Sequence, residues 1–218
     1  MARPQPLIAN AALPQRGRKS PSTGSLGAVS LGAVSPSTGS LSTGSLGALA
    51  VEISLACDAG TATPPDMGSR LGPRIRAALE RAVADPDLLS ARHRVPEKKC
   101  YARRVLYSDP FNRFTILAIV WGPGQFSPPH AHDTWCAYAV YDGPLHETGY
   151  ALDASGTRAN AICTAVHNPG YSCFAGAGFD QIHRLGNAGT KPAISIHVYG
   201  VERERVATHV NRVLEIGE

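Results

Sequence analysis

The sequence lacks long apolar runs. None of its apolar stretches approaches the roughly 20 residues that a helix needs to cross a bilayer, so we expect no transmembrane segment and no membrane partner. Charged residues make up only 17% of the chain and aromatic residues only 6%. By contrast, the 22 Gly and 17 Pro among 218 residues exceed the usual combined share of about 12%. This composition favours a β-rich or partly disordered chain over a helical bundle.

Acidic residues are missing from the first 50 positions, which carry four basic ones: Arg3, Arg16, Arg18 and Lys19. With 21 basic and 17 acidic residues in the whole chain, the remaining part has 17 of each, so the net charge of +4 belongs to the N-terminal segment alone. Nucleic-acid binding needs basic side chains clustered on a folded face. We therefore expect no nucleic-acid partner.

Closely spaced cysteine pairs are also missing. The five cysteines are Cys57, Cys100, Cys136, Cys163 and Cys173. An odd number at wide spacing fits reduced thiols in a cytoplasmic protein better than a disulfide framework or a zinc site built from Cys alone.

Low-complexity sequence occupies residues 20–50, where Pro-Ser-Thr-Gly-Ser-Leu at 21–26 returns at 36–41. Such segments bury too little apolar surface to offset chain entropy, so we predict a disordered extension over residues 1–69. Its basic, acid-free composition is compatible with a transit peptide, a dispensable extension or a misassigned start. The folded domain is then expected at residues 70–218.

The expected fold is dominated by β-strands. Apolar residues at helical spacing predict a short amphipathic helix from about residue 72 to residue 91. After Cys100, short runs of β-branched and aromatic residues alternate with turn residues, which is typical of a sandwich or small barrel. The predicted strands are 105–107, 114–121, 134–141, 145–152, 161–167 and 193–199.

Two short segments carry candidate chemistry. In His130-Ala131-His132, residues two apart on a strand point to the same face, so both imidazoles can reach one metal ion, although such a pair also occurs by chance. In the segment 195–199, the same alternation aligns Ser195, His197 and Tyr199. A hydroxyl, an imidazole and a phenol in a row can form a hydrogen-bond relay. A plain core strand is the alternative, but each polar group would then need its own buried partner.

The segment from Gly124 to Gly143 resembles the first motif of the cupins, with both glycines and both histidines in register. His183 with Asn187 resembles the end of the second cupin motif. The resemblance implies an antiparallel jelly-roll β-barrel, with His183 brought in from the opposite sheet as a third metal ligand. Cupins commonly place a Glu ligand where this chain has Cys136. Three neutral imidazoles would leave room for an anionic substrate, and by themselves they also suit zinc or copper.

From about residue 98 to 201 the chain resembles the type I cysteine dioxygenases, a family of thiol dioxygenases. The matching positions are Tyr101, Arg103, Trp121, Gly122, Gly124, His130, His132, 183–187 and 195–200. The resemblance implies Fe(II) held by His130, His132 and His183. It also implies an enzyme that adds both atoms of O2 to the sulfur of a small thiol carboxylate. L-cysteine is the first choice of substrate, and 3-mercaptopropionate or mercaptosuccinate comes next.

The same resemblance assigns roles around the metal. Arg103 is expected to pair with the substrate carboxylate, because a guanidinium can make two parallel hydrogen bonds to it. Tyr101 is expected to bind substrate beside it. Ser195 and His197 would form the outer relay, with the Tyr199 hydroxyl facing substrate and O2.

The sequence departs from the family pattern at Cys136 and at Ala131. Cys136 stands one residue closer to the second histidine than the cysteine of animal-type members, so it is either cross-linked to Tyr199 by a thioether or an ordinary buried thiol. Ala131 replaces the usual Asp, which removes a side chain able to orient the imidazoles. The remaining histidines in the β-rich part are expected to be spectators: His146, His167 and His209.

Another interpretation is a non-catalytic or differently reactive metal-binding cupin, such as a sensor of a small ligand. The relay argues for an enzyme, because a binding module has little need of an ordered proton path beside its metal. We expect a monomer or a small homo-oligomer.

Overall fold

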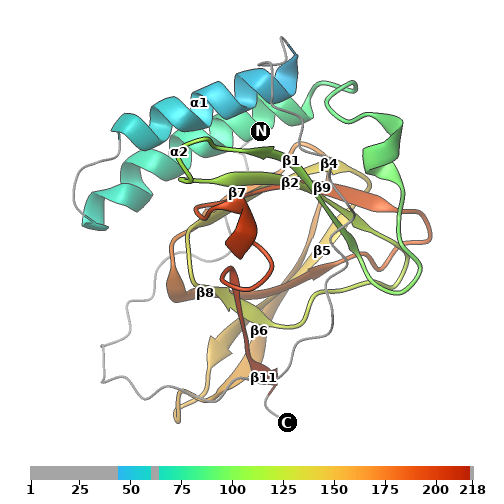
Figure 1. The fold of residues 1–218 in the computed structure, drawn as a ribbon. Coiled ribbons are helices and arrows are strands. Elements are labelled where there is room, and N and C mark those ends of the chain that lie inside the picture. Colours follow the sequence, from blue (N-terminus) through green and yellow to red (C-terminus); the bar gives the residue numbers. More distant parts are fainter. Residues whose placement is uncertain (1–43, 60–63, 217–218) are drawn as a thin grey trace, which may run out of the picture.

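The structure is a computed structural model that describes residues 44–59 and 64–216 (Figure 1). In this part of the chain, helices α1 (Ser45–Ala59) and α2 (Pro64–Val83) precede the strands. Single turns of 3-10 helix, η1 (Ala91–Arg94) and η2 (Arg203–Arg205), lie in the connections. The remaining regular secondary structure of the described residues consists of β-strands.

Two sheets lie face to face beneath the helices (Figure 1). The five-stranded sheet has the order β1 (Ala102–Ser108), β2 (Thr115–Trp121), β9 (Ala193–Tyr199), β4 (Cys136–Asp142), β7 (Ser172–Ala175). The six-stranded sheet has the order β10 (Asn211–Val213), β3 (His130–His132), β8 (Gly178–Gly186), β5 (Leu145–Leu152), β6 (Arg158–His167), β11 (Glu215–Ile216). The described strand pairs are antiparallel except for β11 with β6.

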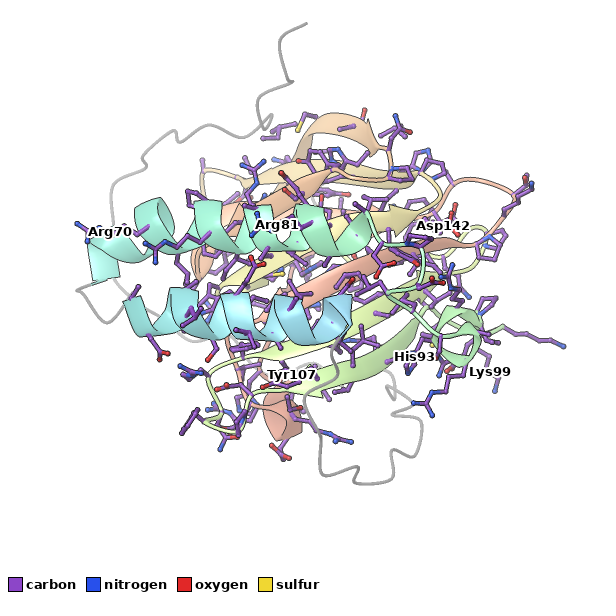
Figure 2. All side chains as sticks on the ribbon, turned by 90° about the horizontal axis from the view of Figure 1, so that it is seen from above. Arg70, Arg81, His93, Lys99, Tyr107 and Asp142 are labelled. Carbon is purple, nitrogen blue, oxygen red and sulfur yellow. The ribbon has the colours of Figure 1, made fainter. Side chains whose placement is uncertain are left out.

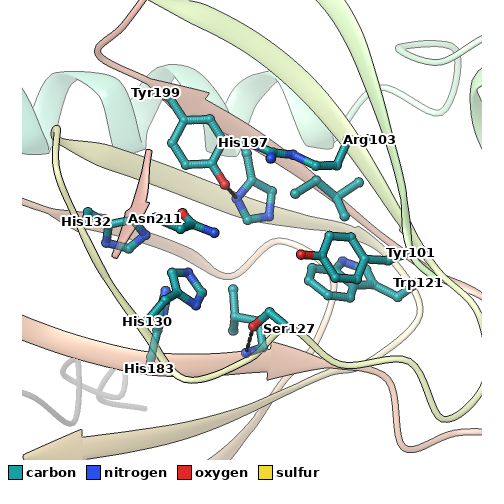
Figure 3. Close-up of a pocket in the computed structure, with 12 residues that line it drawn as sticks. Tyr101, Arg103, Trp121, Ser127, His130, His132, His183, His197, Tyr199 and Asn211 are labelled. Atoms are coloured by element: carbon teal, nitrogen blue, oxygen red, sulfur yellow. Dashed lines mark hydrogen bonds between the residues drawn. The ribbon is translucent and has the colours of Figure 1, made fainter. Parts of the chain in front are cut away.

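Strand alternation gives the five-stranded sheet two different buried faces. On β9, the side chains of Ile194, Ile196 and Val198 join the apolar core shared with the helices. The alternate residues Ser195, His197 and Tyr199 are buried on the other face. His197 and Tyr199 lie between the sheets (Figure 3). A strand buried on both faces can therefore be apolar on one side and chemically active on the other.

The two helices lie side by side across the outer face of this sheet (Figure 2). Leu49 and Ile53 of α1 and Ile75 and Leu79 of α2 are almost fully buried there. Each such side chain contributes about 1.5–3 kcal/mol by leaving water. The helical layer thus supports the strand that bears the candidate relay.

Compared with the sequence expectation, the ordered helical structure begins earlier than residue 70. Helix α1 lies inside the segment 1–69 that was predicted to be disordered, because its apolar residues at helical spacing find a partner in α2. Helix α2 ends at Val83 rather than near residue 91, since Pro86 disfavours helix just before it. Residues 1–43 and 60–63 of the predicted extension lie outside the described residues.

The six predicted strands are present as β1, β2, β4, β5, β6 and β9. The β-dominated fold class is confirmed. The strands that were not predicted are short, as β3 is, or contain Gly, as β8 does. Neither described helix combines the length and apolar character needed to cross a membrane.

Candidate active site

Three buried histidines converge between the sheets (Figure 3). His130 and His132 lie on β3 and His183 on β8, and one ring nitrogen of each lies within 4.8 Å of the others. The same-face prediction for the pair on β3 therefore agrees with the geometry. The prediction that His183 comes from the opposite sheet is wrong, because β8 pairs directly with β3 and places His183 opposite His130.

Two of the three rings, those of His130 and His132, have the electronic form that a metal ion requires. Burial, reinforced by the nearby His183, lowers the pKa of His130 to about 3, and burial also lowers the pKa of His132 well below its ordinary value. Both rings are therefore neutral at pH 7. Nδ1 of His130 donates to the Pro128 carbonyl at 2.9 Å, which leaves Nε2 with a free lone pair.

Unpaired buried nitrogens test whether a metal fits here. Nδ1 of His132 and Nε2 of His183 are buried without a hydrogen-bond partner in the described structure. Buried polar atoms are rarely left in this state, because the loss of water is not compensated. A metal ion bound by the three imidazoles would take one nitrogen from each ring, among them the unpartnered Nε2 of His183, so the residues fit a metal centre.

A carboxylate lies directly behind His183. Glu147 on β5 accepts a hydrogen bond from His183 Nδ1 at 2.6 Å and another from His167 Nε2 at 2.7 Å. Burial by itself would raise the pKa of the Glu147 carboxyl, but these two hydrogen bonds outweigh it and hold the pKa below its ordinary value. His167, which was expected to be a spectator, is only 8% exposed and is one of the two histidines that contact Glu147.

The relay predicted on β9 is present in the five-stranded sheet, across the pocket from the three histidines. Ser195 Oγ lies 2.8 Å from His197 Nε2. The Tyr199 hydroxyl lies 3.3 Å from His197 Nδ1 (Figure 3). Burial, together with Arg103, lowers the pKa of His197 well below its ordinary value, so the ring is neutral. Three polar groups in a row thus find their partners in one another.

Trp121 gives this relay a direction. Its indole N–H can only donate, and it donates to Ser195 Oγ at 2.9 Å. One arrangement that pairs every group has the Ser195 hydroxyl donate to His197 Nε2, while the ring proton on Nδ1 is donated to the Tyr199 oxygen. In that arrangement the hydroxyl proton of Tyr199 is left for another acceptor, and the neighbouring Cys136 sulfur is within hydrogen-bonding reach.

Cys136 stands next to Tyr199. The two residues are register partners on the adjacent strands β4 and β9, and Cys136 is buried. Burial, with Cys173 nearby, raises the pKa of the Cys136 thiol well above its ordinary value, so the sulfur is protonated at neutral pH. The pairing suits either alternative, a thioether to Tyr199 or an ordinary buried thiol, and the thioether stays a prediction.

The expected substrate-binding residues line the same pocket. Arg103 on β1 donates to the Val206 carbonyl at 3.2 Å, and its guanidinium carbon lies 5.6 Å from the centre of the Tyr199 ring. Tyr101 packs its ring against Trp121, with centroids 4.6 Å apart. None of the described lining residues is acidic, so Arg103 gives the pocket one positive charge without a counter-charge.

Sequence reasoning missed Glu147 and Asn211, among other residues of this site. Glu147 could have been found, because it is the lone acidic residue in a predicted strand and shares a strand face with the apolar Leu145. Asn211 gave no signal. It lies on β10 opposite His132 and lines the pocket with its buried Oδ1 unpartnered (Figure 3). His146 and His209 lie outside the lining.

The glycines at both ends of the first motif have a structural reason. Gly124 and Gly143 adopt φ values of 73° and 66°, the left-handed region that side chains disfavour. They form the turns before β3 and after β4. The motif therefore fixes where the histidine-bearing segment enters and leaves the barrel.

Two facing antiparallel sheets that enclose three histidines define a cupin, the double-stranded β-helix class of barrel. The chain matches the family described as cysteine dioxygenase type I over residues 92–209, more than half of its 218 residues. It belongs to this family.

Solved structures of other proteins are similar to parts of the chain. An uncharacterized conserved protein with a double-stranded β-helix domain from Klebsiella pneumoniae subsp. pneumoniae MGH 78578 is 18% identical, with a TM-score of 0.43 over 61% of this chain and 94% of its own. TT1209 from Thermus thermophilus is 21% identical, with a TM-score of 0.38 over 50% of this chain and 91% of its own. The Cupin_2 domain of an XRE family transcriptional regulator from Enterobacter cloacae is 18% identical, with a TM-score of 0.35 over 48% of this chain and 100% of its own.

Proposed function

We propose that this protein is an Fe(II)-dependent thiol dioxygenase that converts a small thiol carboxylate and O2 into the corresponding sulfinic acid. Both oxygen atoms end on sulfur, so the reaction balances without a further reductant. The observation that carries the proposal is the Trp121–Ser195–His197–Tyr199 hydrogen-bond relay, which lies on the sheet facing the three clustered histidines. Family membership supports the same reaction class.

We propose that His130, His132 and His183 hold the iron. When bound, Fe(II) would supply the one-electron chemistry that allows a thiol to react with O2. The three neutral imidazoles add no negative charge. The positive charge of the metal is therefore not neutralised by the protein, and it can attract a thiolate, which is the reactive form of the substrate.

Residues of the five-stranded sheet, which faces the histidines, would orient the substrate and donate protons. Arg103 would bind the carboxylate through paired hydrogen bonds, which fixes the sulfur relative to the histidines. The Tyr199 hydroxyl would donate its proton toward the reacting atoms. Burial, with Cys136 nearby, raises the pKa of this phenol, so it keeps the proton it has to donate.

Charge and hydrogen bonding in the pocket favour L-cysteine among the candidate thiols. Arg103 is the one permanent cation among the described lining residues, which matches one carboxylate and disfavours the second carboxylate of mercaptosuccinate. The buried Oδ1 of Asn211 lacks a donor, and an amine supplies one. 3-Mercaptopropionate satisfies Arg103 but offers nothing to Asn211.

The decisive experiment combines metal analysis with oxygen uptake. The full chain, purified without oxygen, should contain near-stoichiometric iron and consume one O2 per sulfinate formed from cysteine. His197→Ala should keep its iron and lose at least about 100-fold in turnover, the usual scale of general acid–base catalysis. The matched control is His209→Ala, which alters an exposed histidine outside the pocket and should change neither quantity.

Iron without oxygen uptake on cysteine, 3-mercaptopropionate or mercaptosuccinate would contradict the dioxygenase assignment and leave the cupin fold intact. Zinc without uptake would favour a non-catalytic or differently reactive cupin. Equal turnover of wild type and His197→Ala would show that the relay takes no part in the reaction.

A further inference from the structure

Glu147 occupies an unusual place for a carboxylate. It is only 9% exposed, on a strand of the sheet that carries the metal-ligating histidines. Its Oε1 faces His183 Nδ1 at 2.6 Å, and its Oε2 faces His167 Nε2 at 2.7 Å and the Tyr138 hydroxyl at 3.2 Å. Both oxygens are therefore committed to partners inside the protein.

The chemistry of these contacts fixes the tautomer of His183. An ionised carboxylate can only accept hydrogen bonds, so each of its three partners must donate to it. His183 then carries its proton on Nδ1, and its Nε2 keeps the lone pair. That Nε2 is the atom found buried without a partner.

His167 and Tyr138 are themselves held in place. The ring of His167 stacks on that of Tyr171, with centroids 3.7 Å apart and planes inclined by 10°. The ring of Tyr138 stacks on that of His197, with centroids 5.4 Å apart and planes inclined by 18°. Tyr138 thus touches the carboxylate with its hydroxyl and the relay with its ring.

We propose that His167, Glu147 and Tyr138 form a buried clamp that orients His183 and strengthens its bond to the metal. Glu147 acts directly on the ligand, while His167 and Tyr138 are positioning residues that act through Glu147. The described pocket lining contains no acidic residue, and the clamp supplies a negative charge on Glu147. This charge contacts the ligand His183 and not the metal itself. A carboxylate hydrogen-bonded to a ligating imidazole raises the basicity of its free nitrogen.

The proposal concerns the metal centre alone, so it is tested without any thiol. Metal-free full-length protein is titrated with Co²⁺ against a chelating competitor, and the visible absorption of bound Co²⁺ is recorded. Glu147→Gln keeps the shape and loses the charge, so its Co²⁺ dissociation constant should rise about 10- to 100-fold. His167→Gln and Tyr138→Phe should each raise it several-fold, with a shifted Co²⁺ spectrum.

The matched control is His146→Gln, which changes the neighbouring residue on β5 whose ring accepts from the Ala188 N–H instead of contacting Glu147. It should leave affinity and spectrum at wild-type values. Glu147→Asp, which keeps the charge, should recover part of the affinity lost in Glu147→Gln.

Thermal unfolding of the metal-free variants separates the clamp from a purely structural role. If the variants lower the melting temperature but keep the wild-type Co²⁺ affinity and spectrum, the proposal is wrong. Should Glu147→Gln fail to fold, Tyr138→Phe decides, because it removes one hydroxyl and keeps the stacked ring. Failure of the dioxygenase assay would not alter these results, so the two proposals fail separately.

Discussion

At the scale of single residues, the site divides into groups that have all their partners and groups that lack one. Ser195 and His197 are satisfied within the relay, and Glu147 is satisfied by the clamp. Two imidazole nitrogens and the Asn211 amide oxygen lack partners, and the residues that carry them line the pocket. Because buried polar atoms normally find partners, these are the positions where ligands complete the structure.

Asn211 yields a prediction about substrate choice. Asn211→Ala should raise KM for cysteine about 5- to 10-fold, the effect of one lost hydrogen bond, and leave KM for 3-mercaptopropionate nearly unchanged. Steady-state oxygen uptake with both thiols measures this difference. Asn211→Asp keeps an acceptor and should retain the preference for cysteine. An equal rise of KM for both thiols would show that Asn211 does not recognise the amine.

At the scale of elements, an ionic cluster ties helix α1 to the β1–β2 hairpin. Arg113, between β1 and β2, donates to both oxygens of the buried Asp109 at 2.8 and 2.9 Å. It also contacts Ser54 and Asp58 of α1. This cluster fixes the edge of the helical layer that covers the outer face of the five-stranded sheet.

The pH dependence of this cluster can be predicted with its sign. Burial alone would raise the pKa of Asp109, but the hydrogen bonds from Arg113 outweigh it and lower the pKa. A carboxyl with a lowered folded-state pKa stabilises the fold above its unfolded pKa and loses that contribution as the pH falls through the folded one. Asp109→Asn should therefore cost about 1–3 kcal/mol of unfolding free energy at pH 7.

Urea unfolding at pH 7 and at pH 3 checks this expectation, since the gap between Asp109→Asn and wild type should narrow in acid. Asp142→Asn, which alters an exposed residue at the end of β4, is the control and should show no gap at either pH. A gap of the same size at both pH values would mean that the loss is one of packing rather than charge.

At the scale of the whole molecule, the two sheets have separate tasks. The three histidines and the Glu147 clamp belong mainly to the six-stranded sheet, on β3, β8 and β5. Arg103 and the relay belong to the five-stranded sheet, on β1 and β9. A substrate that binds both the metal and Arg103 therefore spans the space between the sheets.

This division predicts how the protein responds to metal removal. Because all three ligands lie on one sheet, a chelator should leave the far-ultraviolet circular dichroism unchanged. The melting temperature should still fall, because metal at 100 times its dissociation constant contributes about 2.7 kcal/mol, equivalent to roughly 5–10 °C for a domain of this size. Loss of the β-sheet spectrum on chelation would show that the metal also holds the two sheets together.

The sequence by itself determined the features that depend on neighbouring residues. Strand alternation placed His130 with His132, and His197 with Ser195 and Tyr199, because side chains two apart share a face whatever the rest of the fold does. The family resemblance added His183 and Arg103, and the fold class followed from regular strands and turns. These are local properties that survive without knowledge of the partner strands.

Only the tertiary structure decided which distant residues meet. Glu147 reaches His167 and His183, which lie 20 and 36 positions away, through the register of β5 with its two neighbours. The pairing of β8 with β3 put His183 in the sheet of β3 rather than opposite it, and α1 became ordered through its contact with α2. The register of a strand is set by its pairing within the whole sheet, and a shift by one residue would turn every side chain to the other face. The sequence of a single segment therefore does not determine which distant residues meet.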